Sequence, residues 1–176
     1  RSKALAEEAV GASGARAVIV RTSLIYGPAV KARQTSVRDM PWRQWDRQTR
    51  WVIGDLKAGE PVRLFTDERR CPIWVRSLAT ALLELARSDV ACSLPASVVH
   101  VAGAQPLSRY EFGLRLAHFH GVDPGGITPA LSRDSGLIRP LDCTLDCSRA
   151  RALLHTPLPG VDQVLRYGKR RGGNPS

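Results

Sequence analysis

The fold of this chain is decided by the stretch Ala17-Val18-Ile19-Val20-Arg21-Thr22-Ser23-Leu24-Ile25-Tyr26-Gly27-Pro28. Residues 17–24 are almost continuously apolar, which predicts a parallel strand covered on both faces. Arg21 lies towards the end of that strand, where an open α/β sheet places ligand-binding groups. Tyr26-Gly27-Pro28 then predicts a sharp turn. Two interpretations of Arg21 stay open: a ligand-binding group, or a structural partner of a carboxylate such as Asp67.

Helical and strand patterns alternate along the rest of the sequence. The apolar periodicity predicts helices over 2–10 and 78–86 and from about 146 and 161, and strands over 62–65, 71–75, 98–102 and 127–131. Asp67 to Arg70 is predicted to be a charged turn. Ser108 and Glu111 have the spacing of a capping box, which opens a further helix burying Phe112, Leu116 and Phe119. Alternating strands and helices predict an α/β architecture.

The segment 30–59 combines tryptophans with arginines. Trp42, Trp45 and the apolar residues up to Leu56 recur at roughly helical spacing, and Gly59 ends the pattern. Arginines at 33, 38, 43, 47 and 50 fall between them. One interpretation is a binding surface on which a base stacks and arginines hold its phosphates. The other is an amphipathic helix with its aromatic residues in the core and its arginines in water.

The chain is strongly basic, with a formal net charge of +10. Such a charge favours anionic partners, although an arginine-rich proteome gives the same balance on solvated faces. The basic tail 167–176 is expected to be disordered. No apolar run is long enough to cross a bilayer. The four cysteines, at 71, 92, 143 and 147, lack the partners of a zinc pattern, so we expect no metal and buried reduced thiols.

Four stretches, in this order, resemble the C-terminal half of an extended short-chain dehydrogenase/reductase. They are residues 1–7, 20–27, 67–75 with 78–79, and 139–149, which read RSKALAE, VRTSLIYG, DERRCPIWV with LA, and RPLDCTLDCSR. Within that superfamily (the NAD-dependent epimerase/dehydratases) the pattern is most similar to the dTDP-4-dehydrorhamnose reductase family, with its RmlD-like substrate-binding domain. The resemblance covers residues 1 to about 165. It departs in the Trp- and Arg-rich segment, which leaves the sugar nucleotide open.

The resemblance implies roles for particular residues. Lys3 matches the catalytic lysine, which would hold the nicotinamide ribose and lower the pKa of a tyrosine four positions earlier. Thr22, Ser23 and Leu24 would line the cofactor pocket. Tyr26, Trp42 and Arg139 would contact the substrate, with the planar guanidinium of Arg139 on the diphosphate. An alternative for Arg139 is a loop residue that caps the Asp146 region.

The same resemblance implies that the sequence begins inside a longer protein. It starts at Arg1, its one methionine is Met40, and neither the tyrosine nor the glycine-rich phosphate turn of the family occurs in it. We therefore expect the C-terminal part of a Rossmann-like doubly wound parallel sheet plus a small α/β substrate-binding domain. The expected parts are a dinucleotide-binding remnant (1–29), a substrate-binding region with returning sheet elements (30–166) and the tail (167–176).

The function implied is reduction of a 4-keto nucleotide sugar, such as dTDP-4-dehydrorhamnose, by NADPH or NADH, in the cytoplasm. The segment alone is expected to be inactive. Three alternatives stay open: epimerase or dehydratase chemistry in the same fold, a non-catalytic binding module that kept the fold, and nucleic-acid binding through the Trp/Arg segment. We expect a nucleotide-sugar ligand, no nucleic acid and no membrane partner; a homodimer is compatible with the resemblance.

Overall fold

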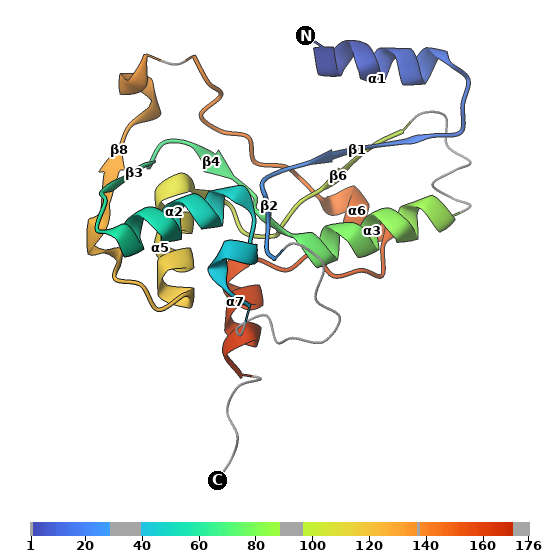
Figure 1. The fold of residues 1–176 in the computed structure, drawn as a ribbon. Helices are drawn as coiled ribbons and strands as arrows, with labels where there is room; N and C mark the ends of the chain where they lie inside the picture. The colour runs from blue at the N-terminus through green and yellow to red at the C-terminus, as the bar shows by residue number, and fades with distance from the viewer. Residues whose placement is uncertain (1, 29–39, 89–96, 137, 171–176) are drawn as a thin grey trace.

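The computed structural model describes residues 2–28, 40–88, 97–136 and 138–170. These residues form two lobes that lie side by side (Figure 1). Three of the four strand pairs in this described part are parallel. The predicted α/β fold is therefore confirmed. The expected arginines at 33 and 38, Cys92 and the end of the tail lie outside the described residues.

The first lobe is built on a parallel pair of strands. β1 (Val18–Thr22) lies beside β6 (Ser97–Val101), in register from Val18 opposite Ser97 to Thr22 opposite Val101. Helices α3 (Val75–Arg87) and α6 (Ser148–Leu153) pack against this pair, and α1 (Ser2–Ala12) lies at the outer side (Figure 1). Their core contains Leu78, Leu85, Val99, Val101 and Leu154.

The second lobe holds the larger core. β3 (Val62–Phe65) runs parallel to β8 (Ile127–Ala130), and helices α2 (Arg47–Ala58) and α5 (Arg109–Phe119) pack beside them. β4 (Arg69–Arg70) pairs antiparallel with β7 (Leu107–Ser108). Short 3-10 turns lie at Trp42–Gln44, Pro124–Gly126 and Ser132–Ser135.

The two lobes are joined by a third parallel pair. β2 (Ile25–Tyr26) lies beside β5 (Ile73–Trp74), and α7 (Val161–Arg170) packs nearby (Figure 1). Tyr26 contacts the edges of both Trp74 and Phe112, with ring centroids 5.4 Å apart in each pair. Edge-to-face packing of this kind suits aromatic quadrupoles. It ties the end of the opening stretch to the core of the second lobe.

Helix ends follow their local chemistry. The predicted capping box is confirmed, because the Ser108 hydroxyl accepts from the Glu111 backbone N–H at 3.1 Å and the Glu111 carboxylate accepts from that of Ser108 at 2.7 Å. The expected single helix from Trp42 is wrong. The Asp46 carboxylate accepts from the backbone N–H groups of Gln48 and Thr49 and so starts α2 at Arg47. Gly59, with φ of 79°, ends α2 as predicted.

Two expectations about burial also need correction. The strand expected to be covered on both faces, β1, is half-buried at Val18 to Val20 and exposed at Arg21 and Thr22. Among the described residues it pairs only with β6, and the helix α1 has no buried residue that would cover it. The segment expected as a charged turn instead contains strand β4, and its Glu68 is buried. In the part of the chain described, no helix is long and apolar enough to span a membrane.

Candidate functional site

A cleft of about 530 Å³ opens on the second lobe. It is lined by Arg47, Gln48, Trp51, Arg63, Leu64, Phe65, Glu68, Arg109 and Arg139. Four of these side chains are cationic, one is acidic and two are aromatic. The lining residues come from α2, β3, the segment between β3 and β4, the start of α5 and the segment after the 3-10 turn Ser132–Ser135. The cleft therefore forms only when these elements assemble.

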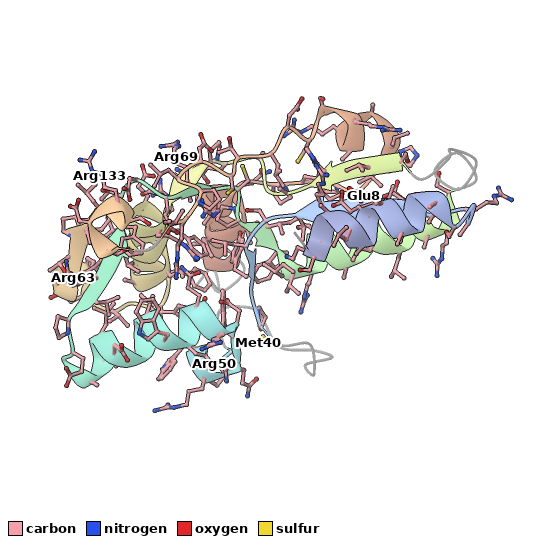
Figure 2. All side chains as sticks on the ribbon, turned by 90° about the horizontal axis from the view of Figure 1, so that it is seen from above. Glu8, Met40, Arg50, Arg63, Arg69 and Arg133 are labelled. Carbon is pink, nitrogen blue, oxygen red and sulfur yellow. The ribbon has the colours of Figure 1, made fainter. Side chains whose placement is uncertain are left out.

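Helical and strand periodicity explain which side chains face the cleft. On α2, Arg47 and Trp51 are four residues apart and lie on one face of the helix, while Val52 and Ile53 are buried in the core. On β3, Val62 and Leu64 are buried and the alternate residue Arg63 is exposed. Figure 2 shows Arg63 at the end of the molecule farthest from α1. Trp51 keeps 46% of its surface exposed, unusually much for a tryptophan.

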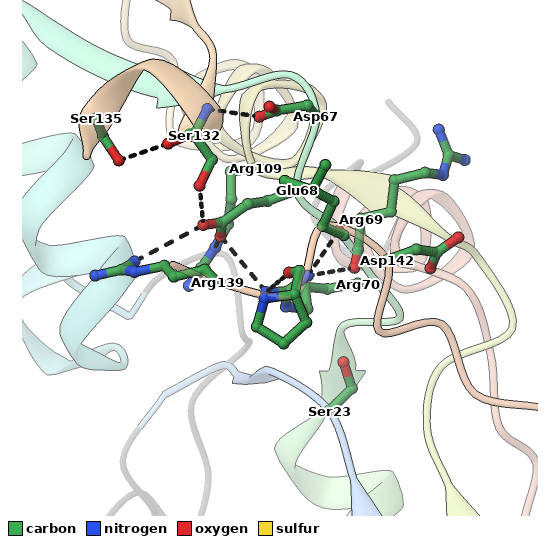
Figure 3. A network of polar contacts seen from close by, with 12 residues as sticks. Ser23, Asp67, Glu68, Arg69, Arg70, Arg109, Ser132, Ser135, Arg139 and Asp142 are labelled. Carbon is green, nitrogen blue, oxygen red and sulfur yellow. Dashed lines mark hydrogen bonds and ion pairs between the residues drawn. The ribbon is translucent and has the colours of Figure 1, made fainter. Parts of the chain in front are cut away.

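Glu68 lies at the base of the cleft and is 1% exposed. Its Oε1 accepts a hydrogen bond from the Ser132 hydroxyl at 2.9 Å and lies 3.8 Å from Arg139 Nη1. Its Oε2 lies 3.5 Å from Arg109 Nε and 3.6 Å from Arg70 Nη2 (Figure 3). A buried carboxylate is costly unless it is paired. Three guanidinium groups and one hydroxyl supply that pairing here.

Arg109 connects Glu68 to α2. Its backbone N–H donates to the Glu68 carbonyl at 3.2 Å, and its Nη1 donates to Gln48 Oε1. Burial lowers the pKa of the Arg109 guanidinium, and the neighbouring Glu68 carboxylate opposes that shift. Arginine stays protonated at neutral pH even so. Arg109 is therefore a fixed positive charge between the base of the cleft and its α2 wall.

A short strap, residues 138–143, carries Arg139 to the cleft. Arg70 fixes the strap, because its Nη1 donates to the Leu141 carbonyl and its Nη2 to the Pro140 carbonyl, both at 3.0 Å. The backbone adds two contacts, from Arg69 N–H to the Leu141 carbonyl at 2.7 Å and from Cys143 N–H to the Arg69 carbonyl at 3.1 Å. Arg139 itself stays 47% exposed at the side chain.

The charge and shape of the cleft suit an anionic ligand with an aromatic group. The lining carries four guanidinium groups against one carboxylate, which leaves an excess of positive charge. Arginine forks match phosphate oxygens, and the exposed Trp51 ring offers a face on which a planar base can stack. Among the described lining residues, the one carboxylate already has four partners.

The structure places the three expected substrate residues differently. Arg139 lines the cleft, as expected, and it contacts Glu68 instead of the Asp146 region. Tyr26 is 1% exposed in the core, where burial, and secondarily Asp162, raises the pKa of its hydroxyl far above its usual value. Trp42 is half-buried, with Arg43 stacked 4.5 Å from its ring centroid. Tyr26 and Trp42 are not among the cleft-lining residues, and their substrate contacts stay predictions.

The residues expected to serve the cofactor lie in the first lobe. Thr22 donates its hydroxyl to the Val101 carbonyl at 2.7 Å, and the Ser23 hydroxyl accepts from Cys71 N–H at 3.1 Å. The Leu24 carbonyl accepts from Ile73 N–H at 2.7 Å. These bonds fix the end of β1 against the neighbouring segments. Lys3 is exposed on α1, and its catalytic role stays a prediction.

Arg21 has a structural partner, but it is not the expected one. Its guanidinium binds the Glu7 carboxylate of α1, with Nη2 and Oε2 2.6 Å apart. Asp67 instead accepts from the backbone N–H groups of Ser132 and Arg133, and these bonds lower the pKa of its carboxyl. The expected pairing of Arg21 with Asp67 is therefore wrong.

The first lobe carries the residues that the family resemblance assigns to the nicotinamide end of a dinucleotide. The Arg21–Glu7 pair joins the exposed end of β1 to α1, the helix that carries the exposed Lys3. Both elements lie in the first lobe (Figure 1). The sequence has no glycine-rich turn between a strand and a helix that would hold a pyrophosphate. The role of Lys3, Thr22, Ser23 and Leu24 beside a nicotinamide therefore stays a prediction, and the sequence holds no glycine-rich cradle for the phosphates. Among the described residues, no cluster of His, Cys, Asp and Glu side chains could hold a metal ion.

Several cleft residues were missed from the sequence. Trp51 had a usable signal, because it lies four residues after Arg47, which the sequence had already placed in a possible binding surface, on the helix face opposite the buried Val52 and Ile53. Arg63 and Phe65 alternate with buried residues on a predicted strand, which is also a readable signal. Glu68 had none, since its neighbours in the cleft come from residues 109, 132 and 139.

The fold defines the class of protein: an α/β architecture of the Rossmann-like, short-chain dehydrogenase/reductase type. A solved structure described as a hypothetical dTDP-4-dehydrorhamnose reductase from Sulfolobus tokodaii matches with a TM-score of 0.59 and 28% identity, over 84% of this chain and 45% of that one. The dTDP-4-dehydrorhamnose reductase of Bacillus anthracis, solved with NADP, matches with a TM-score of 0.66 and 17% identity, over 88% and 48% of the two chains. DesIV, a dTDP-glucose 4,6-dehydratase of Streptomyces venezuelae solved with NAD and TYD, matches with a TM-score of 0.63 and 17% identity, over 97% of this chain and 51% of that one.

The RmlD substrate binding domain model matches residues 1–167, and the chain belongs to that family. Among curated proteins, it is 28% identical over 167 residues to the "Probable low-salt glycan biosynthesis reductase Agl14" of Haloferax volcanii, covering 94% of this chain and 51% of the relative. The chain therefore spans about half the length of the proteins that it matches. The resemblance predicted from four sequence stretches is confirmed at the level of the family.

Proposed function

We propose that this chain is the substrate-binding part of an NAD(P)-dependent reductase of nucleotide sugars, and that the cleft around Glu68 holds the nucleoside diphosphate. One observation carries the proposal: four arginines and an exposed tryptophan line a single cleft on a chain of the RmlD substrate binding domain family. Arginine recognises phosphate through paired N–H groups. Tryptophan supplies the stacking face for the base.

The proposed reaction is reduction of a 4-keto sugar, with dTDP-4-dehydrorhamnose as the first substrate to test. A reduced nicotinamide supplies the hydride when it is bound. This chain contributes Lys3 to the catalytic centre, and Thr22, Ser23 and Leu24 to the nicotinamide wall. Arg139 binds the diphosphate from the strap. The diphosphate is then an anchor that keeps the sugar in place for the reaction.

Epimerase and dehydratase chemistry have weaker support. The neighbours that carry these names, DesIV and a UDP-glucuronic acid 4-epimerase of Bacillus cereus, are 17% and 18% identical to this chain and share its fold alone. The identity of this chain to proteins described as reductases reaches 28%. Reduction is therefore the reaction that we propose first, and the cytoplasmic location and homodimer stay predictions.

The binding half of the proposal is tested on this chain with dTDP. Titration calorimetry should show saturable binding of dTDP, with weaker binding of thymidine, because thymidine lacks the phosphates. Arg139→Gln should raise the dTDP Kd about tenfold, the cost of a lost charged hydrogen bond. Arg133→Gln is the matched control, since Arg133 is exposed and does not line the cleft. Absence of dTDP binding by the folded chain would reject this use of the cleft.

The catalytic half is tested on the whole protein that contains this chain. Oxidation of NADPH and NADH is followed with a panel of 4-keto nucleotide sugars. Lys3→Ala should lower kcat strongly, because the Lys3 ammonium next to the catalytic tyrosine would hold the pKa of that tyrosine near the working pH. An unchanged rate would remove Lys3 from the mechanism, while leaving the binding role of the cleft untouched.

A further inference from the structure

Glu68 is the one charged side chain among the described residues that is buried to this degree. It sits at the base of a cleft whose other charges are all positive. A carboxylate at that place lowers the positive potential that an anionic ligand meets. Its presence therefore needs a reason other than direct attraction of the ligand.

The geometry points to positioning. Glu68 Oε2 lies between Arg109, from α5, and Arg70, from β4, while Oε1 lies between the Ser132 hydroxyl and Arg139 on the strap. The carboxylate thus contacts groups from four separate segments (Figure 3). Without it, three guanidinium groups would repel one another around the same point. With it, each keeps a defined place.

The three arginines are not equivalent. Arg70 donates to the carbonyls of Arg69, Pro140 and Leu141, so its N–H groups serve the backbone. Arg109 and Arg139 line the cleft, and their distances to Glu68, 3.5 and 3.8 Å, exceed those of good hydrogen bonds. Glu68 therefore holds these two by charge. Apart from the Arg109 Nη1 that donates to Gln48, it leaves their donors to a ligand.

We propose that Glu68 is a positioning residue, which sets the Arg109 and Arg139 guanidinium groups over the cleft before the ligand arrives. This inference rests on the proposed function, because it takes the ligand to be the diphosphate of a nucleotide. Side chains ordered in advance lose little freedom on binding, and affinity rises accordingly. The ligand phosphates then meet both guanidinium groups in place.

The test is whether the dTDP Kd rises or falls in the Glu68→Gln variant. If Glu68 acted only through its negative charge, removing that charge would tighten dTDP binding. Positioning predicts the reverse: Glu68→Gln raises the dTDP Kd about tenfold, and Glu68→Asp also raises it, because the shorter side chain cannot reach all its partners. Asp67→Asn is the matched control. It removes the neighbouring carboxylate, which contacts the backbone of Ser132 and Arg133 and no cleft arginine, and it should leave the Kd unchanged.

A second readout separates positioning from general damage. Thymidine has no phosphate, so Glu68→Gln should leave its affinity near that of the unaltered chain while dTDP affinity falls. Equal losses for both ligands would indicate a merely structural role and overturn the inference. If Glu68→Gln does not fold, Ser132→Ala decides, since it removes the hydroxyl held by Glu68 and keeps every charge. We expect a dTDP Kd about threefold higher in Ser132→Ala, and an unchanged value would overturn the inference.

The two proposals fail in different ways. If the unaltered chain does not bind dTDP, the proposed function of the cleft falls. If the unaltered chain binds dTDP and Glu68→Gln binds it equally or more tightly, the cleft keeps its function and Glu68 loses its positioning role.

Discussion

Arg21 binds Glu7 through two parallel contacts, from Nε to Oε1 at 3.0 Å and from Nη2 to Oε2 at 2.6 Å. This bidentate geometry is the strong form of an arginine–carboxylate pair. It joins the end of β1 to α1, a helix that buries none of its residues. The placement of α1, and of Lys3 on it, therefore depends on this pair and on the loop between the two elements.

Glu7→Gln should loosen α1 without unfolding the protein. Amide hydrogen exchange over residues 2–12 should become faster, because the helix loses its charged contact with β1, while the Tm stays nearly constant. Glu8→Gln is the control, as Glu8 is the exposed neighbour on the same helix (Figure 2). Equal exchange in both variants would contradict this. Arg21 lowers the pKa of Glu7, so the contact holds at neutral pH and weakens as the pH falls through that lowered pKa.

His120 should make the stability of the fold sensitive to mild acid. Its ring packs 4.7 Å from Trp45, and burial, with a smaller effect from Lys57 and opposition from Asp46, lowers its pKa from 6.5 to about 4. As the pH falls, His120 is therefore protonated in the unfolded chain before it is protonated in the folded one. The contribution of neutral His120 to the free energy of unfolding is therefore complete above pH 6.5. It is lost as the pH falls towards 4, by at most about 3 kcal/mol.

Urea unfolding at pH 7 and pH 4.5 measures this effect. His120→Gln should lose less stability than the unaltered chain between the two values, since glutamine does not titrate. His118→Gln is the control, because His118 is exposed in the last turn of α5, two residues before His120. Several carboxyl groups also titrate in acid, so the difference between variants is the informative quantity. A parallel loss in His120→Gln and in the unaltered chain would reject the assignment.

Gly103 is required by a close backbone approach. A Cβ there would lie 2.0 Å from the Pro72 carbonyl oxygen, which is backbone and cannot rotate away. Gly103→Ala should therefore lower the free energy of unfolding by about 3 kcal/mol, at the upper end of overpacking costs. Gly54→Ala is the matched change in α2, where the Cβ meets only the Trp42 ring at 3.3 Å. Helix propensity favours alanine by about 1 kcal/mol, so this variant should keep or slightly gain stability. Equal losses would contradict the account.

Trp42, the substrate residue expected from the sequence, and Trp51, which lines the cleft in the structure, can be tested against each other. Trp51 lines the cleft and is 46% exposed, whereas Trp42 packs against the core. Trp51→Leu should weaken dTDP binding severalfold by removing the stacking face and should abolish most of the fluorescence change on binding. Trp42→Leu should leave the dTDP Kd within about twofold of the original. The opposite pattern would restore Trp42 as the substrate residue.

Most helices and strands could be predicted because their signals are local. The capping box at Ser108 and the left-handed glycine after α2 depend on neighbours within a few residues. The exception at Trp42 is equally local: Asp46 captures the first amide groups of α2 and separates the two elements. Periodicity alone could not reveal this, since Trp42 and Trp45 fit the helical spacing.

The site was harder to predict because its contacts are remote in sequence. Arg139 was expected from the family resemblance, and it does line the cleft. Glu68 was expected in a solvated turn, since a run of four charged residues usually faces water. It is buried because Arg109, Ser132 and Arg139 converge on it from distant positions. Only the assembled fold brings those partners together.

The cations that line the cleft come from separate elements: Arg47 from α2, Arg63 from β3, Arg109 from α5 and Arg139 from the strap. A substitution at one of them leaves the backbone that carries the others in place. As sequences diverge, substitution of single side chains can therefore change which ligand such a site prefers, while the fold of the backbone stays the same. Protein engineers can exploit the same modularity by varying Arg47 and Arg63 at the rim while keeping the Glu68 anchor.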